Sequence, residues 1–177
     1  ELIVIVKLTR NFGTYPAIIA GYEKARGDCI INISADLQDP PELINEMLNS
    51  YFIENFNIAI CHRNSRDESA YRSITSKIFY GTIRKYCFSN MPKGGFDFIL
   101  ISHKVKKEIL HDLEVDFFLQ GKILWTGYKI KFIPYKRMKR KEGKSQWTFS
   151  KKMKWFIDAV MSYSFFPIRF MSSFGVV

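Results

Sequence analysis

Cysteine is scarce in this chain of 177 residues, which contains only Cys29, Cys61 and Cys87. The number is odd, the three lie far apart, and two fall within apolar stretches that resemble strands. Disulfide frameworks and zinc sites use cysteines in pairs at short, regular spacings. We therefore expect buried thiols in a reducing compartment, not a disulfide-stabilised or zinc-binding protein.

Long uncharged stretches and histidine clusters are also missing. No stretch of 18 residues is free of charged side chains, so we expect no complete transmembrane helix. His62, His103 and His111 lack metal-ligand spacing, which argues against a histidine-based site. The content of hydrophobic residues, 47%, and of aromatic residues, 16%, excludes a disordered chain and suits one domain with a sizeable core.

Acidic residues are nearly absent from one segment, residues 129–154. The segment carries eleven lysines and arginines and a single acid, Glu142. It accounts for the whole net charge of +10, because the rest of the chain has 16 basic and 16 acidic residues. A localised basic patch indicates an anionic partner, which could be a membrane surface, a phosphate-bearing substrate or nucleic acid.

The order of apolar runs and helical patterns is typical of an α/β protein. Nearly continuous apolar runs, or an alternating run in the last case, predict strands at residues 1–8, 29–34, 57–62, 96–101 and 129–134. Helical spacing and capping residues predict helices at residues 14–26, 40–48, 68–89, 102–110, 116–125 and 150–161. Strands that are apolar on both faces favour a mostly parallel sheet flanked by helices.

The turn after the second predicted strand, residues 35–42 (ADLQDPPE), is the most informative stretch. Asp39 is predicted to cap the following helix, with a proline and a glutamate suitably placed after it. This assignment leaves Asp36 and Gln38 without a local structural role. Both lie just past the carboxyl end of a strand, where open α/β sheets bind ligands. One carboxylate and one amide oxygen suit a hard divalent cation that takes its other ligands from phosphate and water.

Residues 35–42 resemble the metal-binding turn of family 2 glycosyltransferases. They are most similar to the polyprenyl-phosphate branch, which includes dolichyl-phosphate mannosyltransferase-like and undecaprenyl-phosphate sugar transferases. The resemblance implies a GT-A-like (Rossmann-like) fold and a bound Mg²⁺ or Mn²⁺. Many members have a first aspartate where this chain has Ser34, so the metal would be bound by Asp36 and Gln38. It also makes Asp36 a catalytic residue. Residues 10–13 (RNFG) resemble the turn after the family's third strand, so we expect the chain to be N-terminally truncated by two strands.

Two further segments resemble motifs of the same family. Arg63 and Arg66 look like its arginine-rich turn, which implies contact with donor or lipid phosphate; a solvated loop is the alternative. Asp97 and Phe98 match part of a Gly-Asp-Phe-Arg pattern whose aspartate lies near the acceptor phosphate and the metal. Asp97 is therefore a candidate catalytic residue, and a strand-end hydrogen bond is the alternative.

The basic residues 136–149 are similar to the family's loop that closes over the donor diphosphate, with the pattern Arg-x-x-Gly-x-Ser-Lys-Trp/Tyr. Arg137, Arg140, Ser145 and Gln146 are the candidate donor-binding residues, and Gln146 replaces the usual lysine. One guanidinium group can donate two parallel hydrogen bonds to phosphate oxygens. A glycine gives a loop the backbone freedom to close over a substrate. A solvated basic loop is the alternative.

Residues 150–161 form an amphipathic pattern with lysines at its start. Such a helix can lie in the headgroup plane of an anionic membrane, although a helix packed on a domain has a similar pattern. Residues 163–177 become more apolar, and the family's transmembrane helices begin about here. We expect a partial catalytic domain at 1–149, then an interfacial helix at 150–177 leading toward a membrane anchor. We also expect residues 1–177 on their own to be inactive as an enzyme.

The resemblance thus implies an inverting, metal-dependent transfer of a sugar from a nucleotide-sugar donor to undecaprenyl or dolichyl phosphate, a step in glycan biosynthesis. It implies a location at the cytoplasmic face of the membrane, the bacterial inner membrane in particular. A family 2 enzyme with a soluble or polysaccharide acceptor is the alternative, and a homo-oligomer stays open. Nucleic acid is a poor partner, because the basic segment lacks a known binding motif and the acidic turn repels a phosphate backbone.

Overall fold

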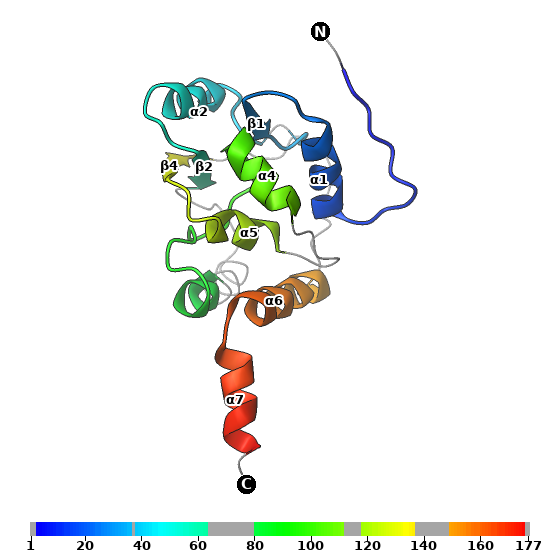
Figure 1. The fold of residues 1–177 in the computed structure, drawn as a ribbon, viewed down its shortest axis with the longest axis vertical. Coiled ribbons are helices and arrows are strands. Elements are labelled where there is room, and N and C mark those ends of the chain that lie inside the picture. The colour runs from blue at the N-terminus through cyan, green and yellow to red at the C-terminus, as the bar shows by residue number, and fades with distance from the viewer. Residues whose placement is uncertain (1–2, 37, 64–79, 112–117, 137–148, 176–177) are drawn as a thin grey trace.

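The computed structural model describes residues 3–36, 38–63, 80–111, 118–136 and 149–175 (Figure 1). Within these ranges one four-stranded sheet has the order β1-β3-β2-β4. The strands are β1 (Cys29–Asn32), β2 (Ile58–Arg63), β3 (Phe98–Ser102) and β4 (Ile130–Tyr135). β3 runs antiparallel to both of its neighbours, and β2 and β4 are parallel. The α/β class is confirmed, and β1, β2 and β4 share one direction, but the reversal of β3 makes the sheet mixed.

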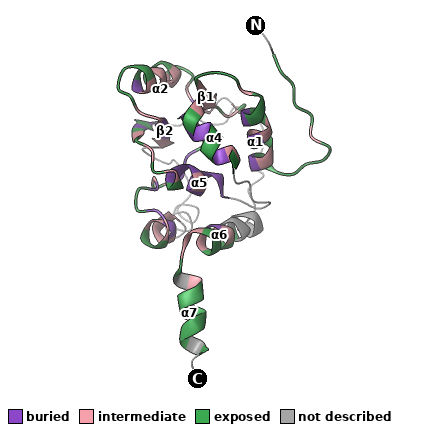
Figure 2. Ribbon diagram, in the orientation of Figure 1, coloured by how far each residue is buried: buried purple, intermediate pink, exposed green. Residues whose placement is uncertain are grey.

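Helices cover both faces of this sheet. They are α1 (Thr14–Lys24), α2 (Leu43–Phe52), α4 (His103–His111), α5 (Leu119–Trp125), α6 (Phe149–Tyr163) and α7 (Phe166–Phe174), and residues 80–86 are also helical. Along β2, Ile58 and Ile60 belong to one hydrophobic cluster and Ala59 and Cys61 to the other. Because alternate residues of a strand point to opposite faces, the strand is buried on both sides, as predicted. The buried residues gather around the sheet in Figure 2.

The first cluster packs under α1, α4 and α5, and the second packs under α2. Ser102 opens α4, where its hydroxyl accepts a hydrogen bond from the backbone N–H of Val105 at 3.3 Å. This serine cap agrees with the sequence pattern. All three cysteines are free thiols, and burial raises the pKa of Cys61 to about 12, so this thiol stays protonated at neutral pH.

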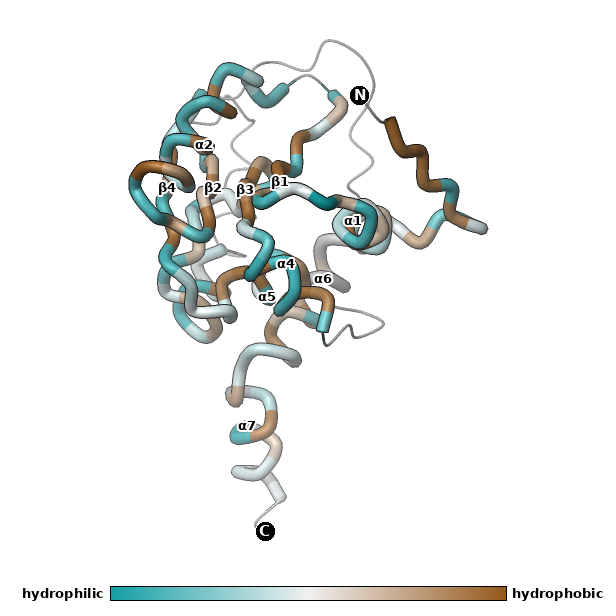
Figure 3. Tube along the Cα trace, turned by 45° about the horizontal axis from the view of Figure 1, so that its top comes forward, coloured by the Kyte–Doolittle hydropathy of each residue, from teal (hydrophilic) through white to brown (hydrophobic). Residues whose placement is uncertain are grey.

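The prediction of a strand at residues 1–8 is wrong. Residues 3–8 have no regular structure and are largely exposed, with Ile3 and Ile5 exposed by 89% and 88%. This apolar segment stands apart from the sheet in Figure 1 and is brown in Figure 3. β-branched residues favour an extended backbone, but a strand also needs a partner, and no described strand pairs with this segment.

The capping role predicted for Asp39 is also wrong. α2 begins at Leu43, after a turn in which the N–H of Leu43 donates to the Pro40 carbonyl at 3.3 Å. Asp39 is buried instead, and accepts a hydrogen bond from the hydroxyl of Tyr135. A local sequence pattern cannot reveal this competing partner, which lies 96 residues further along the chain.

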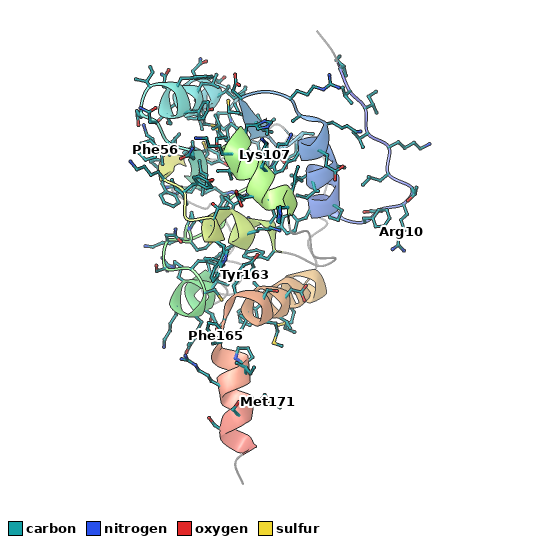
Figure 4. The ribbon with its side chains drawn as sticks, viewed as in Figure 1. Arg10, Phe56, Lys107, Tyr163, Phe165 and Met171 are labelled. Carbon is teal, nitrogen blue, oxygen red and sulfur yellow. The ribbon has the colours of Figure 1, made fainter. Side chains whose placement is uncertain are left out.

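The contact of α6 with α5 depends on Gly121. A methyl group at this position would lie 2.6 Å from Phe118, 2.9 Å from Tyr163 and 3.0 Å from Phe88. The Phe88 and Tyr163 rings pack together with centroids 5.0 Å apart, and Figure 4 shows Tyr163 between α5 and α6. The missing side chain therefore permits this aromatic packing.

We expect Gly121→Ala to destabilise the protein by about 1–3 kcal/mol, because the added methyl group overpacks the aromatic contact. Thermal unfolding followed by circular dichroism measures the effect. Gly21→Ala in α1 is the matched control, since a methyl group added there has nothing within 4 Å of it. The control should be neutral or stabilising, because alanine is a better helix former than glycine. Equal melting temperatures for both variants would contradict the role of Gly121.

Candidate functional site

The candidate site lies at the edge of the sheet where three strands end and β3 begins. Asn32 ends β1, Arg63 ends β2 and Tyr135 ends β4. Asp97 immediately precedes β3, which enters from the same edge because it runs against its neighbours. Ligands of open α/β sheets bind beyond the carboxyl ends of the strands, so the arrangement brings these side chains to the expected place.

Asp97 is held by three side chains from different elements. The Arg63 guanidinium lies 3.3 Å from one carboxylate oxygen, and the Gln120 amide of α5 donates to the other at 3.4 Å. The Asn32 amide donates to the Asp97 backbone carbonyl at 2.8 Å. The Asp97 side chain is 57% exposed, so the ion pair contributes little to stability. Its carboxylate is oriented, and it remains accessible to a ligand.

Tyr135 and Asp39 form a second, buried pair next to Arg63. The phenol of Tyr135 donates to the Asp39 carboxylate, and the ring packs edge-to-face on Phe98 with centroids 6.4 Å apart. Burial raises the pKa of Tyr135, the hydrogen bond to Asp39 raises it further, and the nearby Arg63 opposes the shift. The phenol is thus a neutral hydrogen-bond donor at physiological pH.

The turn that carries Asp36 and Gln38 is closed by a local hydrogen bond. The backbone N–H of Gln38 donates to Oδ1 of Asp36 at 3.3 Å, as in an Asx-turn. The expectation that Asp36 has no local structural role is therefore wrong. An ionised carboxylate can accept several hydrogen bonds or bind a cation as well, so the hydrogen bond of the Asx-turn is compatible with a bound metal ion.

The donor chemistry of this turn fits Mg²⁺ or Mn²⁺ only in part. The described residues contain no group of three or more histidine, cysteine, aspartate or glutamate side chains that could hold a metal ion. A cation at Asp36 and Gln38 would take its remaining ligands from phosphate and water, which is how Mg²⁺ usually binds beside substrate phosphates. The residues present thus fit a metal that arrives with a diphosphate.

Comparison with known proteins identifies the family. The model of the family described as Glycosyl transferase family 2 matches residues 1–110. The chain belongs to glycosyltransferase family 2. Membership implies a transferase with the GT-A fold, as the resemblance of residues 35–42 indicated.

The relatives of this family 2 chain include several bacterial proteins. "Uncharacterized glycosyltransferase sll0501" of Synechocystis sp. is 35% identical over 99% of this chain and 55% of its own length. "Putative glycosyltransferase CsbB" of Bacillus subtilis is 33% identical over 97% of this chain and 52% of its own length. "Prophage bactoprenol glucosyl transferase homolog" of Escherichia coli is 30% identical over 99% of this chain and 58% of its own length. The chain spans about half the length of these relatives, and the predicted similarity to the polyprenyl-phosphate branch is confirmed.

Of the site residues that the sequence predicts, the structure brings Arg63 and Asp97 into contact. It places Asp36 and Gln38 in the turn beyond β1, joined to the same edge through Asp39 and Tyr135. The other candidates lie outside the described residues, and their roles stay predictions; they are Arg66, Arg137, Arg140, Ser145 and Gln146.

The sequence did not mark three residues that the structure adds to the candidate site. Gln120 donates to the carbonyl of Phe96, the residue before Asp97, as well as to Asp97 itself. Tyr15 of α1 is buried close by, and burial together with the negative charge of Asp97 raises the pKa of its phenol. Tyr135 ends a strand at the same edge, which is the one signal that could have pointed to it.

Proposed function

We propose that this glycosyltransferase transfers a sugar from a nucleotide-sugar donor to a polyprenyl phosphate, with inversion at the anomeric carbon. The observation that carries the proposal is the convergence of Arg63, Asp97 and the Asp36–Gln38 turn at one edge of the sheet. The acceptor is supported by relatives that are named bactoprenol glucosyl transferases, since bactoprenol is a polyprenol. The same names make glucose the first sugar to test.

In the proposed reaction the acceptor phosphate, Arg63 and Asp97 have different roles. An oxygen of the acceptor phosphate attacks the anomeric carbon, and the bond to the nucleoside diphosphate breaks. Arg63 binds phosphate oxygens, because a guanidinium can donate two parallel hydrogen bonds to them. Asp97 orients this guanidinium from a solvent-accessible position. The acceptor phosphate is already anionic, so no strong general base is needed.

Asp36 and Gln38 would hold Mg²⁺ or Mn²⁺ beside the departing diphosphate. When bound, such a cation neutralises the charge that develops on the leaving group. Arg66 and the basic residues of segment 136–149, with Arg137, Arg140, Ser145 and Gln146 among them, are proposed to add contacts to the same diphosphate. Together these groups provide the electrostatic stabilisation that the transfer requires.

The proposal places the enzyme at the cytoplasmic face of the membrane, with residues 1–149 as the catalytic part and 150–177 as an interfacial part. On α6, Met153, Ile157 and Met161 are spaced at four residues and are exposed. α7 stands away from the body (Figure 2), and carries exposed Ile168 and Met171, of which Met171 is labelled in Figure 4. No helix in the described ranges is long and apolar enough to cross a membrane. An exposed apolar row on a helix that begins with lysines supports contact with an anionic bilayer surface.

We expect serine at Met153, Ile157 and Met161 together to weaken binding to vesicles that contain anionic lipid by about tenfold or more, since three side chains lose apolar burial. Co-sedimentation with the vesicles measures the binding. The matched control replaces Phe52 and Ile53, at the C-terminal end of α2, by serine. These side chains are also apolar and exposed, by 62% and 72%, but they do not belong to α6. Equal loss in both variants, or none in the first, would contradict the assignment of this surface.

The acceptor assignment is tested with the full-length protein, by following the transfer of radiolabelled sugar from UDP-glucose, and then from other nucleotide sugars, to undecaprenyl phosphate. Labelled lipid that depends on the acceptor phosphate is the expected product. Transfer to soluble sugars or polysaccharide, with none to the lipid, would replace this proposal by the alternative acceptor class.

A further inference from the structure

Tyr135 connects two parts of the site that are remote in sequence. It is the last residue of β4, and both it and Asp39 are almost fully buried, with exposed fractions of 7% and 2%. Its hydroxyl donates to the Asp39 carboxylate. A hydrogen bond to a carboxylate inside the protein is stronger than one at the surface. This bond therefore fixes the position of the turn relative to the end of β4.

The turn itself lies outside regular structure. β1 ends at Asn32 and α2 begins at Leu43, and the described residues between them, 33–36 and 38–42, belong to neither. Asp39 directly follows Gln38 in this segment and lies three residues after Asp36. The position of the proposed metal ligands relative to the sheet therefore depends on how Asp39 is held.

On its other side, Tyr135 lies next to Arg63. The two residues are register partners on the parallel strands β2 and β4, which lie about 4.8 Å apart in any sheet. The Arg63 guanidinium is near enough to lower the pKa of the phenol against the effect of Asp39. Arg63 in turn pairs with Asp97, so one continuous chain of contacts runs from the turn to both Arg63 and Asp97.

We propose that Tyr135 is a positioning residue that holds the Asp36–Gln38 turn at a fixed distance from Arg63, so that a cation in the turn and the guanidinium can bind the same diphosphate. The inference rests on the proposed function, because it takes the turn and Arg63 to share one ligand. Tyr135 acts through Asp39 and Arg63; it is itself almost fully buried and is given no contact with the substrate.

The test measures binding of Mn²⁺ in the presence of inorganic pyrophosphate, from the electron paramagnetic resonance signal of free Mn²⁺. Tyr135→Phe keeps the ring on Phe98 and removes only the hydroxyl. We expect it to weaken Mn²⁺ binding about tenfold or more, as is usual when a group that orients a metal ligand is lost. Asp39→Ala removes the acceptor in place of the donor and should show the same loss. Asp39→Asn, whose amide oxygen can still accept from Tyr135, should bind Mn²⁺ more tightly than Asp39→Ala.

Tyr51→Phe is the matched control. Its hydroxyl donates to the backbone carbonyl of Asp28, before the start of β1, at 3.3 Å, so its loss should leave Mn²⁺ binding unchanged. Parent-like Mn²⁺ affinity in Tyr135→Phe or Asp39→Ala, with a lower melting temperature alone, would show a merely structural contact and overturn the inference. If Asp36→Ala loses binding in the same series, the proposed function still stands. A parent protein that binds no Mn²⁺ with pyrophosphate would overturn the inference and the metal-dependent function together.

Discussion

We expect sugar transfer by the full-length protein to fall by about 10³-fold or more in Asp36→Ala, because the proposed cation at the leaving diphosphate contributes several kcal/mol of transition-state stabilisation. Asp36 supplies the carboxylate that is proposed to bind this cation. Its carboxylate also closes the turn by accepting from the Gln38 N–H, so its loss removes both the ligand and the shape of the turn. The measurement is the initial rate of labelled-lipid formation at saturating Mn²⁺ or Mg²⁺.

Two further variants separate these effects. Asp36→Asn retains an oxygen that can accept from the Gln38 N–H, so the turn persists while the negative charge is lost; we expect most of the activity to be lost as well. Asp28→Ala is the control, since Asp28 is an exposed carboxylate at the opposite end of β1, and its rate should match that of the parent. Near-normal turnover in Asp36→Ala would remove this residue from the mechanism.

The layers of this fold could be predicted from the sequence because they depend on local patterns. Adjacent residues of β2 are apolar, which predicts a strand buried on both faces. Ile58 and Ala59 do belong to different hydrophobic clusters. The direction of β3 could not be predicted, because its side chains alternate in the same way in a parallel or an antiparallel pairing. Its reversal matters for the site, since it brings Asp97 at the start of β3 to the end of β2.

The candidate residues of the site could be named from the sequence, but the contacts between them could not. Residue types and their place after a strand selected Asp36 and Gln38 as candidates, and the resemblance to family 2 glycosyltransferases added Arg63 and Asp97. The partner of Asp39 is different in kind, because a capping pattern is visible within four residues and a buried phenol 96 residues away is not. Where the two compete, the tertiary contact prevails, since an ionised group gains more from a buried, oriented donor than from a solvent-exposed helix end.

Replacement of Arg63 by alanine is the other change for which we expect a large effect. We expect kcat/KM for the nucleotide sugar to fall about 10²-fold or more, because a preorganised donor to the leaving phosphate is lost. Arg63→Lys should recover only part of the rate, since an ammonium group cannot donate two parallel hydrogen bonds to phosphate. In the pair with Asp97, the carboxylate side chain is 57% exposed and the Arg63 side chain 16%. Loss of the ion pair itself should therefore cost less than about 1 kcal/mol of stability, and the melting temperature is measured alongside to show that the fold persists.

Lys131→Ala is the control that separates a local effect from one of net charge. Lys131 lies on β4 and pairs with Glu54, outside the candidate site, and its removal changes the charge of the protein by the same amount. If attraction of an anionic substrate to the whole basic protein were responsible, both variants would lose activity equally and high salt would abolish the difference. If Arg63 binds the diphosphate directly, only Arg63→Ala loses activity, and the difference persists as salt is raised because a bound, desolvated contact is screened less than a long-range field.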